Sequence, residues 1–458
     1  MIPVYVVLLS MVAAVQAETK CYENLGCFTN DGPYGDLLLR PLSIFPDSPK
    51  TINTRFLLFT VDNTDHYQVV SAYNLSSLRE SNYNCSRKTI YIVHGFIEKG
   101  TDPWLVGLCR VILQRYDVNC ICVDWSGGSY ALYTKAANNV QVVGAEIAHF
   151  INVTMTNLSC PLDNTILIGH SLGAHAVGEA GKRRPGVPVI FGLDPAGPFF
   201  QDTAPVVRLD PTDGLRVYAI HTNRGLLGID QSVGHKDFNP NGGRNQPGCS
   251  ILQTTLDLVN YQLSNLSTGA LNIFKCSHVA SVKLFTESVI NPGGFMAYCA
   301  DDYPSFTAGA GFPCPNGSCT LMGYNTRDEG DATCQNYYLN TGPEHDYERW
   351  RYNVTLQITG SAVLGSLQVT LCNPSNCSED NEIYSGVIAG GTYSKFIDAR
   401  IPGPVTNVTF IWKILLNLFN QKLGAKSVTV QDGKGTVYKF CGNAITRDGV
   451  PQTLHHCP

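Results

Sequence analysis

The chain has 458 residues, 44% of them hydrophobic and 15% charged, with a formal net charge of −5 at pH 7. This length predicts two folded domains, and the acidic balance argues against a nucleic-acid partner, since Lys182-Arg183-Arg184 is the densest basic cluster. No stretch after residue 17 reaches the ~20 apolar residues of a membrane-spanning helix, so no transmembrane segment is expected.

Residues 1–17 are typical of a secretory signal peptide, with an apolar core from Val4 to Ala14 and the cleavage pattern Val15-Gln16-Ala17. We expect the mature chain to begin near Glu18. The 17 cysteines predict disulfides formed in an oxidising compartment, because no metal-ligand cysteine spacing is present. Nine glycosylation sequons agree with export, at Asn74, Asn84, Asn152, Asn157, Asn265, Asn316, Asn353, Asn376 and Asn407.

Residues 165–180 predict a strand, a sharp turn and a helix. Thr165 to Ile168 is a short apolar run that suits a buried strand, and Ala174 to Ala180 is rich in helix formers. Between them, Gly169-His170-Ser171-Leu172-Gly173 has the spacing of a nucleophile elbow, in which small residues leave room beside the serine. The helix N-terminus would favour an oxyanion there. Ser171 is therefore a candidate nucleophile, and a tight glycine-rich turn is the alternative interpretation.

A serine nucleophile needs a base and an acid that orients the base. The apolar run 187–193 predicts a second buried strand and delivers Asp194 at its carboxyl end, where parallel sheets place functional side chains. Asp210 and Asp213 remain rival acids. His221, His235 and His278 are the candidate bases, and we favour His278 because it follows Cys276 closely.

Cys249 and Cys276 bracket 26 residues, which suggests a flap hinged by a disulfide. Within it, apolar residues recur at i, i+4, i+7 and i+11 and predict one helical stripe, formed by Leu252, Leu256, Val259 and Leu263. Such a stripe would cover an apolar active-site mouth when closed and face lipid when open. A helix packed in the core is the alternative.

From Arg349 onward the pattern changes to alternating apolar and polar residues. Runs at 354–358, 367–371 and 427–430 alternate with period two, which argues for a β-sandwich. We therefore expect a signal peptide at 1–17, an α/β domain at 18–344 with its flap at 249–276, and a β-sandwich domain at 345–458.

The chain resembles the pancreatic lipases and their related proteins over nearly its whole length. The residues that carry the resemblance are 21–27, 53–58, His94-Gly95-Phe96, 120–125, 169–175, 192–198, Cys276-Ser277-His278 and 349–352. The resemblance implies an α/β-hydrolase domain followed by a PLAT-type β-sandwich. It also implies roles for five residues: Ser171 as nucleophile, Asp194 as orienting acid, His278 as base, and the backbone N–H groups of Phe96 and Leu172 as the oxyanion hole.

Asp210-Pro211-Thr212-Asp213 has a second interpretation, because two carboxylates on one turn suit a hard cation. The resemblance implies a structural calcium ion held by the side chains of Asp210 and Asp213 and the carbonyls of Pro205 and Arg208. Pro205 replaces the family's usual glutamate, but the ligand there is a main-chain oxygen. A turn without metal is the alternative, and no organic cofactor is expected.

The resemblance also implies five disulfides, namely Cys21–Cys27, Cys109–Cys120, Cys249–Cys276, Cys314–Cys319 and Cys441–Cys457. Cys85 and Cys160 precede strands expected to be neighbours, so they could be bridged. Cys372 and Cys377 flank a predicted turn. The usual family partner of Cys299 is missing from this chain, so Cys334 is the remaining partner for it. Cys122 is then expected to be a buried free thiol.

These features predict a secreted triacylglycerol lipase that acts at a lipid emulsion or micelle surface. Colipase, which docks on the sandwich of similar enzymes, is a candidate partner. A phospholipase A1 or galactolipase of the related-lipase type is an alternative. The segment before Gly234, Asn223 to Val233, has only 11 residues and is shorter than the resemblance to pancreatic lipases would imply. The flap also has no tryptophan. A weakly active or non-catalytic lipid-binding relative is a further alternative. Ala280 departs from the arginine common in the family.

Overall fold

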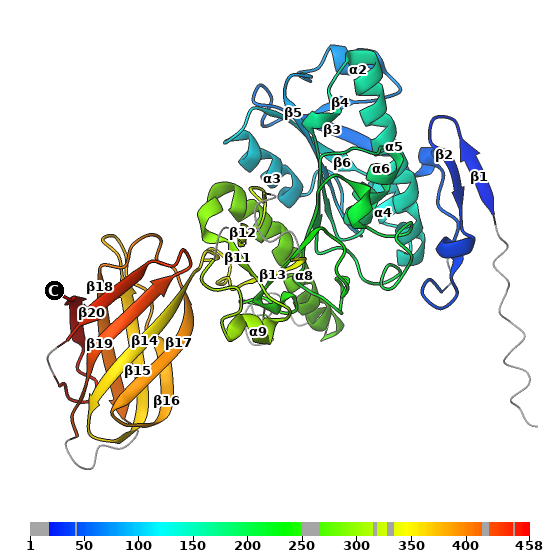
Figure 1. Cartoon of the computed structure of the whole chain (residues 1–458). Helices are drawn as coiled ribbons and strands as arrows, with labels where there is room; N and C mark the ends of the chain where they lie inside the picture. The colour runs from blue at the N-terminus through cyan, green and yellow to red at the C-terminus, as the bar shows by residue number, and fades with distance from the viewer. Residues whose placement is uncertain are drawn as a thin grey trace, which may run out of the picture. The chain divides into compact units, whose positions relative to one another are not determined.

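The computed structural model describes residues 18–41, 44–249, 266–314, 318–327, 334–414, 421–442 and 445–458, with side chains in helix α8 described from Lys275 onward. Packing divides the chain into two compact units, with the division between Asp237 and Phe238. Figure 1 shows the elements of both units. The predicted signal peptide and the predicted flap stripe, Leu252, Leu256, Val259 and Leu263, lie outside the described residues.

A mixed, mostly parallel sheet forms the centre of the first unit. The part of the sheet from β9 to β4 follows the order β9-β8-β7-β5-β6-β3-β4, and within this part only β3 and β4 form antiparallel pairs. Strands β5 to β8 are buried along most of their length, as expected for a parallel sheet covered on both faces. The bounds are β3 Arg55–Phe59, β4 Gln68–Val70, β5 Lys88–Val93, β6 Val118–Asp124, β7 Thr165–His170, β8 Val189–Leu193 and β9 Val217–Ile220.

Helices α3, α5 and α6 lie in the connections between the parallel strands β5, β6, β7 and β8. Helices α5 and α6 approach each other closely, because a Cβ atom on Gly144 of α5 would lie 2.5 Å from the Cβ of Glu179 on α6. Phe150 of α5 stacks on Phe56 of the sheet, with ring centroids 4.3 Å apart. The helical bounds are α1 Pro49–Ile52, α2 Leu75–Arg79, α3 Pro103–Leu113, α4 Ser126–Ser129, α5 Tyr133–Leu158 and α6 Leu172–Arg183, with short 3-10 turns η2 Gly32–Gly35, η3 Leu162–Asn164 and η4 Pro211–Asp213. A hairpin of β1 Thr19–Tyr22 and β2 Gly26–Thr29 precedes them.

The first part of the second unit is built around α8, Leu266–Ile290. Strand β11 pairs antiparallel with both β12 and β13. The remaining elements are β10 Lys236–Pro240, which crosses the division between the units, and η5 Asn241–Gly243, η6 Pro292–Gly294, β11 Met296–Cys299, α9 Tyr303–Thr307, β12 Thr320–Leu321 and β13 Asn336–Leu339.

An all-antiparallel β-sandwich completes the second unit, drawn from yellow to red in Figure 1. The order β16-β15-β18-β21-β20-β19-β14-β17 encloses an apolar core that includes Trp412, Phe410 and Tyr352. The bounds are β14 Trp350–Gly360, β15 Val363–Cys372, β16 Asn381–Ile388, β17 Gly391–Ala399, β18 Asn407–Ile414, β19 Leu423–Asp432, β20 Val437–Cys441 and β21 Gln452–His456. The predicted fold class, an α/β domain followed by an all-β sandwich, is confirmed.

The sandwich is tied to the elements just before it. Arg351 of β14 donates hydrogen bonds to the Phe306 carbonyl and to the Asp398 carboxylate, each 2.8 Å long. The bond to Phe306 is one contact that joins residues 238–349 to the sandwich within this unit. The predicted domain boundary after Glu344 stays a prediction. Among the described residues, no helix combines the length and the apolar character needed to cross a membrane.

Candidate active site

Ser171 lies at the turn between β7 and α6. Its backbone has φ 55° and ψ −120°, a conformation that L-residues rarely adopt, and its side chain is buried. The turn requires glycine on both sides: a Cβ on Gly169 would lie 2.2 Å from the Gly173 carbonyl oxygen, and a Cβ on Gly173 would lie 2.3 Å from the Val93 carbonyl oxygen. The sequence therefore forms the strained strand-to-helix turn of a nucleophile elbow.

The residues after β8 are hydrogen-bonded to this turn. The Ser171 N–H donates to the Leu193 carbonyl at 3.1 Å, and the Ala196 N–H donates to the Ser171 carbonyl at 3.2 Å. Asp194 follows Leu193 directly, with φ 43° and a fully buried side chain. The structure thus brings Ser171 and Asp194 together at the carboxyl edge of the sheet.

The carboxylate of Asp194 is held by backbone donors. Its Oδ1 accepts hydrogen bonds from the N–H groups of Thr222 at 2.8 Å and Asn223 at 3.1 Å. Gly228 presses against the same group, since a Cβ added there would lie 2.5 Å from Oδ1. A carboxylate fixed in this way can orient an imidazole and stabilise its charged form.

The loop from His94 to Glu98 passes next to Ser171. A Cβ on Gly95 would lie 2.8 Å from the Cβ of Ser171, so the loop can come this close only because residue 95 is glycine. Phe96 follows Gly95, and Leu172 is the first residue of α6, where backbone N–H groups have no acceptor within the helix. This arrangement suits an oxyanion hole made from the N–H groups of Phe96 and Leu172.

Several hydrogen bonds fix the His94 to Glu98 loop. The Trp125 indole N–H donates to the His94 carbonyl at 2.9 Å, and the Ile97 N–H donates to the Ser129 carbonyl at 3.2 Å. The Ser129 hydroxyl donates to the Glu98 carbonyl at 2.7 Å. These bonds hold the loop in one position, and donors held in this way would suit electrostatic stabilisation of a transition state.

Glu98 is a site residue that sequence reasoning missed. Its buried carboxylate accepts a 2.7 Å hydrogen bond from the Gly95 N–H, and its Oε2 lies 3.5 Å from Nδ1 of His170. Burial raises the pKa of the Glu98 carboxyl, but His170, the Gly95 N–H and the nearby charge of His94 outweigh burial and lower that pKa to about 2. The sequence does place a carboxylate, Glu98, three residues after Gly95, and this spacing was the only signal for it. The contact of Glu98 with His170 depends on the tertiary fold and could not be read from spacing.

The rival bases of the first unit have other partners. His221 and Asp237 form a fully buried pair, with Nε2 2.6 Å from Oδ1, and Nδ1 of His235 accepts a 2.9 Å hydrogen bond from the Val217 N–H. His278 is buried in α8 of the second unit, and its carbonyl accepts from the Ser281 hydroxyl at 2.9 Å. The role of His278 as base stays a prediction.

The rival acids Asp210 and Asp213 lie at η4, which packs against α6. Asp210 Oδ1 accepts from the N–H and the hydroxyl of Thr212, while Asp213 Oδ2 accepts from the Asp210 N–H at 2.9 Å and from the Lys182 ammonium at 2.8 Å. Burial raises the pKa of the Asp213 carboxyl to about 7, although Lys182 opposes this shift. Pro205 lies in a turn closed by a hydrogen bond from the Val207 N–H to the Ala204 carbonyl.

The chemistry of this turn fits a hard cation in one respect. Asp213 Oδ1 is a buried oxygen without a hydrogen-bond partner, and the predicted ligands are all oxygens. In the part of the chain that the structure describes, no group of three His, Cys, Asp or Glu side chains is placed to hold a metal ion. A cation at η4 would therefore rely on the two carboxylates and on backbone carbonyls.

Eight disulfides are present among the described residues, and Cys122 is a buried free thiol there. The pairs are Cys21–Cys27, Cys85–Cys160, Cys109–Cys120, Cys249–Cys276, Cys299–Cys334, Cys314–Cys319, Cys372–Cys377 and Cys441–Cys457.

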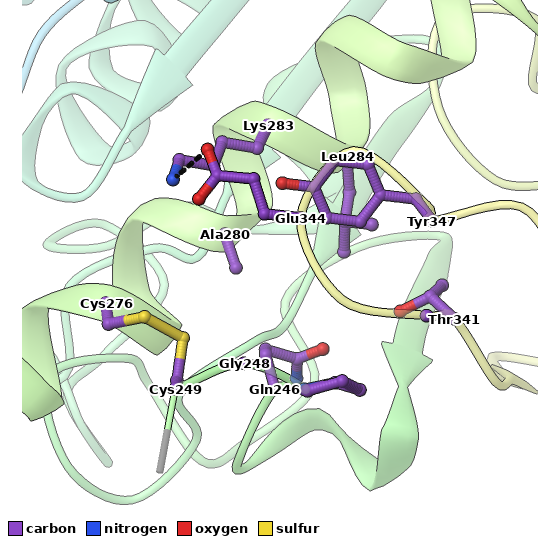
Figure 2. A pocket seen from close by; sticks show the side chains of 12 residues that line it. Gln246, Gly248, Cys249, Cys276, Ala280, Lys283, Leu284, Thr341, Glu344 and Tyr347 are labelled. Atoms are coloured by element: carbon purple, nitrogen blue, oxygen red, sulfur yellow. Dashed lines mark hydrogen bonds and ion pairs between the residues drawn. A yellow bond between two sulfur atoms is a disulfide. The ribbon is translucent and has the colours of Figure 1, made fainter. Parts of the chain in front are cut away.

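A small pocket lies beside the Cys249–Cys276 disulfide (Figure 2). Ala280 lines it, and the ion pair of Lys283 with Glu344, 2.6 Å long, lies at its edge. It holds about 40 Å³ of space, far less than the several hundred Å³ of a typical ligand site. The pocket is therefore too small for a lipid acyl chain.

Comparisons with known proteins agree with this geometry. A family model described as "Lipase" matches residues 18–347. The "Pancreatic triacylglycerol lipase" of Ictidomys tridecemlineatus is 41% identical, and the match covers 98% of each chain. The "Pancreatic lipase-related protein 2" of Rattus norvegicus is 43% identical over 98% of each chain, and the human "Inactive pancreatic lipase-related protein 1" is 39% identical over 99% of each chain.

Proposed function

The chain belongs to the lipase family, and we propose that it is a secreted carboxylic ester hydrolase that cleaves triacylglycerol at an oil–water interface. The observation that carries this proposal is the elbow at Ser171, with the buried Asp194 carboxylate hydrogen-bonded next to it and the Gly95 loop against it. Secretion is supported by the number of disulfides in the described residues.

The proposed reaction proceeds through an acyl-enzyme. Ser171 Oγ attacks the ester carbonyl while His278 accepts its proton, and Asp194 orients His278 and stabilises its charged form. The tetrahedral oxyanion receives hydrogen bonds from the N–H groups of Phe96 and Leu172. His278 then protonates the departing alcohol, and water attacks the acyl-serine by the same route to release the fatty acid.

An exposed apolar rim near the oxyanion loop supports action at a lipid surface. Ile97, Tyr130 and Leu132 are 53%, 56% and 75% exposed. They adjoin the loop, because the Ile97 N–H bonds to Ser129 and the ring of Tyr133 contacts Phe96 edge-on at 5.1 Å. Burying such side chains in lipid is favourable at ~25 cal/mol per Å² of apolar surface.

A phospholipase or galactolipase activity is the second candidate function, and the segment 223–233 favours it. This short segment folds back on itself, since the N–H groups of Leu226 and Gly228 both donate to the Asn223 carbonyl. The Gly197 N–H donates to the Leu227 carbonyl at 2.8 Å, and this bond holds the segment beside the residues that follow Asp194. A compact segment here would leave space for a polar headgroup at the site. The presence of Ser171, Asp194 and His278 disfavours the third alternative, a non-catalytic relative.

We also propose a structural calcium ion at η4, held by the side chains of Asp210 and Asp213 and the carbonyls of Pro205 and Arg208. The unpartnered, buried Asp213 Oδ1 supports this proposal. Calcium there would stabilise the turn and take no part in ester cleavage. Colipase is proposed as a partner of the C-terminal sandwich.

Substrate class can be decided by direct assay. Purified full-length protein is incubated with emulsified triolein, phosphatidylcholine and a galactolipid, with and without colipase, and released fatty acid is titrated. We expect triolein to be cleaved fastest, and stimulation by colipase when bile salt is present. Faster cleavage of the phospholipid or galactolipid would select the second candidate function, and cleavage of none would support the non-catalytic alternative.

A further inference from the structure

Lys182 of α6 places its ammonium group on two of the oxygens proposed as calcium ligands. Its Nζ donates to the Arg208 carbonyl at 2.7 Å and to Asp213 Oδ2 at 2.8 Å. The Asp213 side chain is fully buried, whereas the Lys182 side chain is 19% exposed. One end of the lysine is thus enclosed by the turn while the side chain keeps a route to solvent.

The chain itself supplies the positive charge that this turn needs. Arg208 Nη1 lies 3.3 Å from Asp210 Oδ2, and Lys182 bonds to Asp213, so each carboxylate faces one cation. Without these cations, two neighbouring carboxylates would be buried and would repel each other. The ammonium group therefore does, in part, what a bound cation would do.

The turn lies directly on α6 and is linked to the active site. A Cβ on Gly181 would lie 2.0 Å from the Asp213 carbonyl oxygen, so helix and turn are in close contact. Nδ1 of the buried His175 accepts from the Leu209 N–H at 3.0 Å, and its Nε2 lies 2.9 Å from the Ala196 carbonyl. Loosening the turn should therefore weaken the support of the helix that begins after Ser171.

We infer that Lys182 and a calcium ion compete for the Arg208 carbonyl and the Asp213 carboxylate. The ammonium group keeps the turn folded when calcium is absent, and it moves toward solvent when calcium binds. This inference rests on the calcium site proposed above. It is physically reasonable because calcium requires six to eight oxygen ligands, and lysine is a flexible point charge that can leave without a change in the backbone.

Full-length wild-type protein and the variant Lys182→Met provide the test, by calorimetric titration with CaCl2 and by thermal unfolding in CaCl2 or EGTA. Removing the competitor should tighten calcium binding about tenfold or more. It should also lower Tm in EGTA by roughly 5 °C, with recovery in calcium, because the fully buried Asp213 carboxylate loses its cation. Lys283→Met is the matched control, since it removes a lysine from an exposed ion pair with Glu344 and should change neither quantity.

Equal calcium affinity in wild type and Lys182→Met would overturn the competition, and so would weaker binding in the variant. A lack of calcium binding by both proteins would remove the calcium site and the competition together. Ester hydrolysis is measured separately, so that outcome leaves the proposed lipase activity standing.

Amine labelling gives a second readout that needs no variant, in case Lys182→Met does not fold. Labelling of Lys182 in the wild-type protein, located by peptide mass spectrometry, should rise severalfold when CaCl2 is added. Lys135 is the internal control, because its ammonium group donates to the Phe45 carbonyl at 2.7 Å, away from the turn. Unchanged Lys182 labelling in protein that has bound calcium would overturn the inference.

Discussion

Gly95 and Ser171 approach each other so closely that a single added methyl group on Gly95 would lie 2.8 Å from the Ser171 Cβ. The same methyl group would lie 3.3 Å from the Glu98 carboxylate and from the His170 carbonyl, so it would be crowded on every side. The position of the Phe96 N–H therefore depends on the absence of a side chain at residue 95.

The variant Gly95→Ala should lower turnover of a soluble short-chain ester by about 10²- to 10³-fold, the usual cost of losing one oxyanion donor. The fold should persist, because the change is confined to a loop. Gly107→Ala in α3 is the matched control, since nothing lies within 4 Å of an added Cβ there, and it should keep full activity. If Gly95→Ala turns over substrate at the wild-type rate, Phe96 is not an oxyanion donor.

Glu98 should make stability depend on pH in the acid range. Its pKa is lowered from 4.5 to about 2 in the folded protein, so the ionised carboxylate stabilises the fold above about pH 4.5, and this contribution is lost as pH falls toward 2. The shift corresponds to about 3 kcal/mol. The Tm difference between wild type and Glu98→Gln should be largest above pH 4.5 and shrink toward pH 2. A difference independent of pH would contradict the proposed interaction.

Leu132 should contribute to adsorption on lipid and not to chemistry. Leu132→Ser removes an exposed apolar side chain at the N-cap of α5, where serine is a favourable residue, so stability should be kept or improved. Binding to triolein emulsion should weaken severalfold while soluble-ester turnover is unchanged. Leu215→Ser is the matched control. Leu215 is 65% exposed, but it precedes β9 and so lies at the amino ends of the parallel strands, whereas Ser171 follows the carboxyl end of β7. Equal adsorption of the two variants would contradict a role in lipid adsorption for the apolar rim that includes Leu132.

His221 and His278 should respond differently to the same substitution. His278→Gln should lower turnover by on the order of 10⁶-fold, because it removes the base of the triad. His221→Gln should mainly lower Tm, since it breaks the buried pair with Asp237, and folded protein should keep turnover within about tenfold of wild type. The reverse pattern would make His221 the base.

Local pattern was enough to predict the elements that carry the proposed site. The apolar run at 165–168 became β7, and the run at 187–193 became β8, which places Asp194 directly after its last residue. The alternating runs after Arg349 became β14, β15 and β19. These predictions succeed because burial follows the apolar pattern directly: burial is nearly continuous along β7 and β8, and it alternates along much of β14, β15 and β19.

Contacts between residues far apart in sequence could not be predicted in this way. His170 lies 72 residues from Glu98, and Lys182 lies 31 residues from Asp213, so neither partner can be inferred from spacing. The sequence predicted oxygen ligands at η4, but it gave no indication that an ammonium group reaches the same oxygens. Charged side chains in particular take their partners from the tertiary fold.

The central claim is that Ser171 is the nucleophile of an ester hydrolase, and Ser171→Ala tests it most directly. Hydrolysis of emulsified triolein and of a soluble short-chain ester is measured for wild type and variant at equal concentrations of folded protein, verified by circular dichroism and Tm. The account predicts that the variant loses turnover on both substrates by on the order of 10⁶-fold and keeps its fold. A folded variant that retains a tenth of wild-type activity would contradict the assignment of Ser171 and the mechanism built on it.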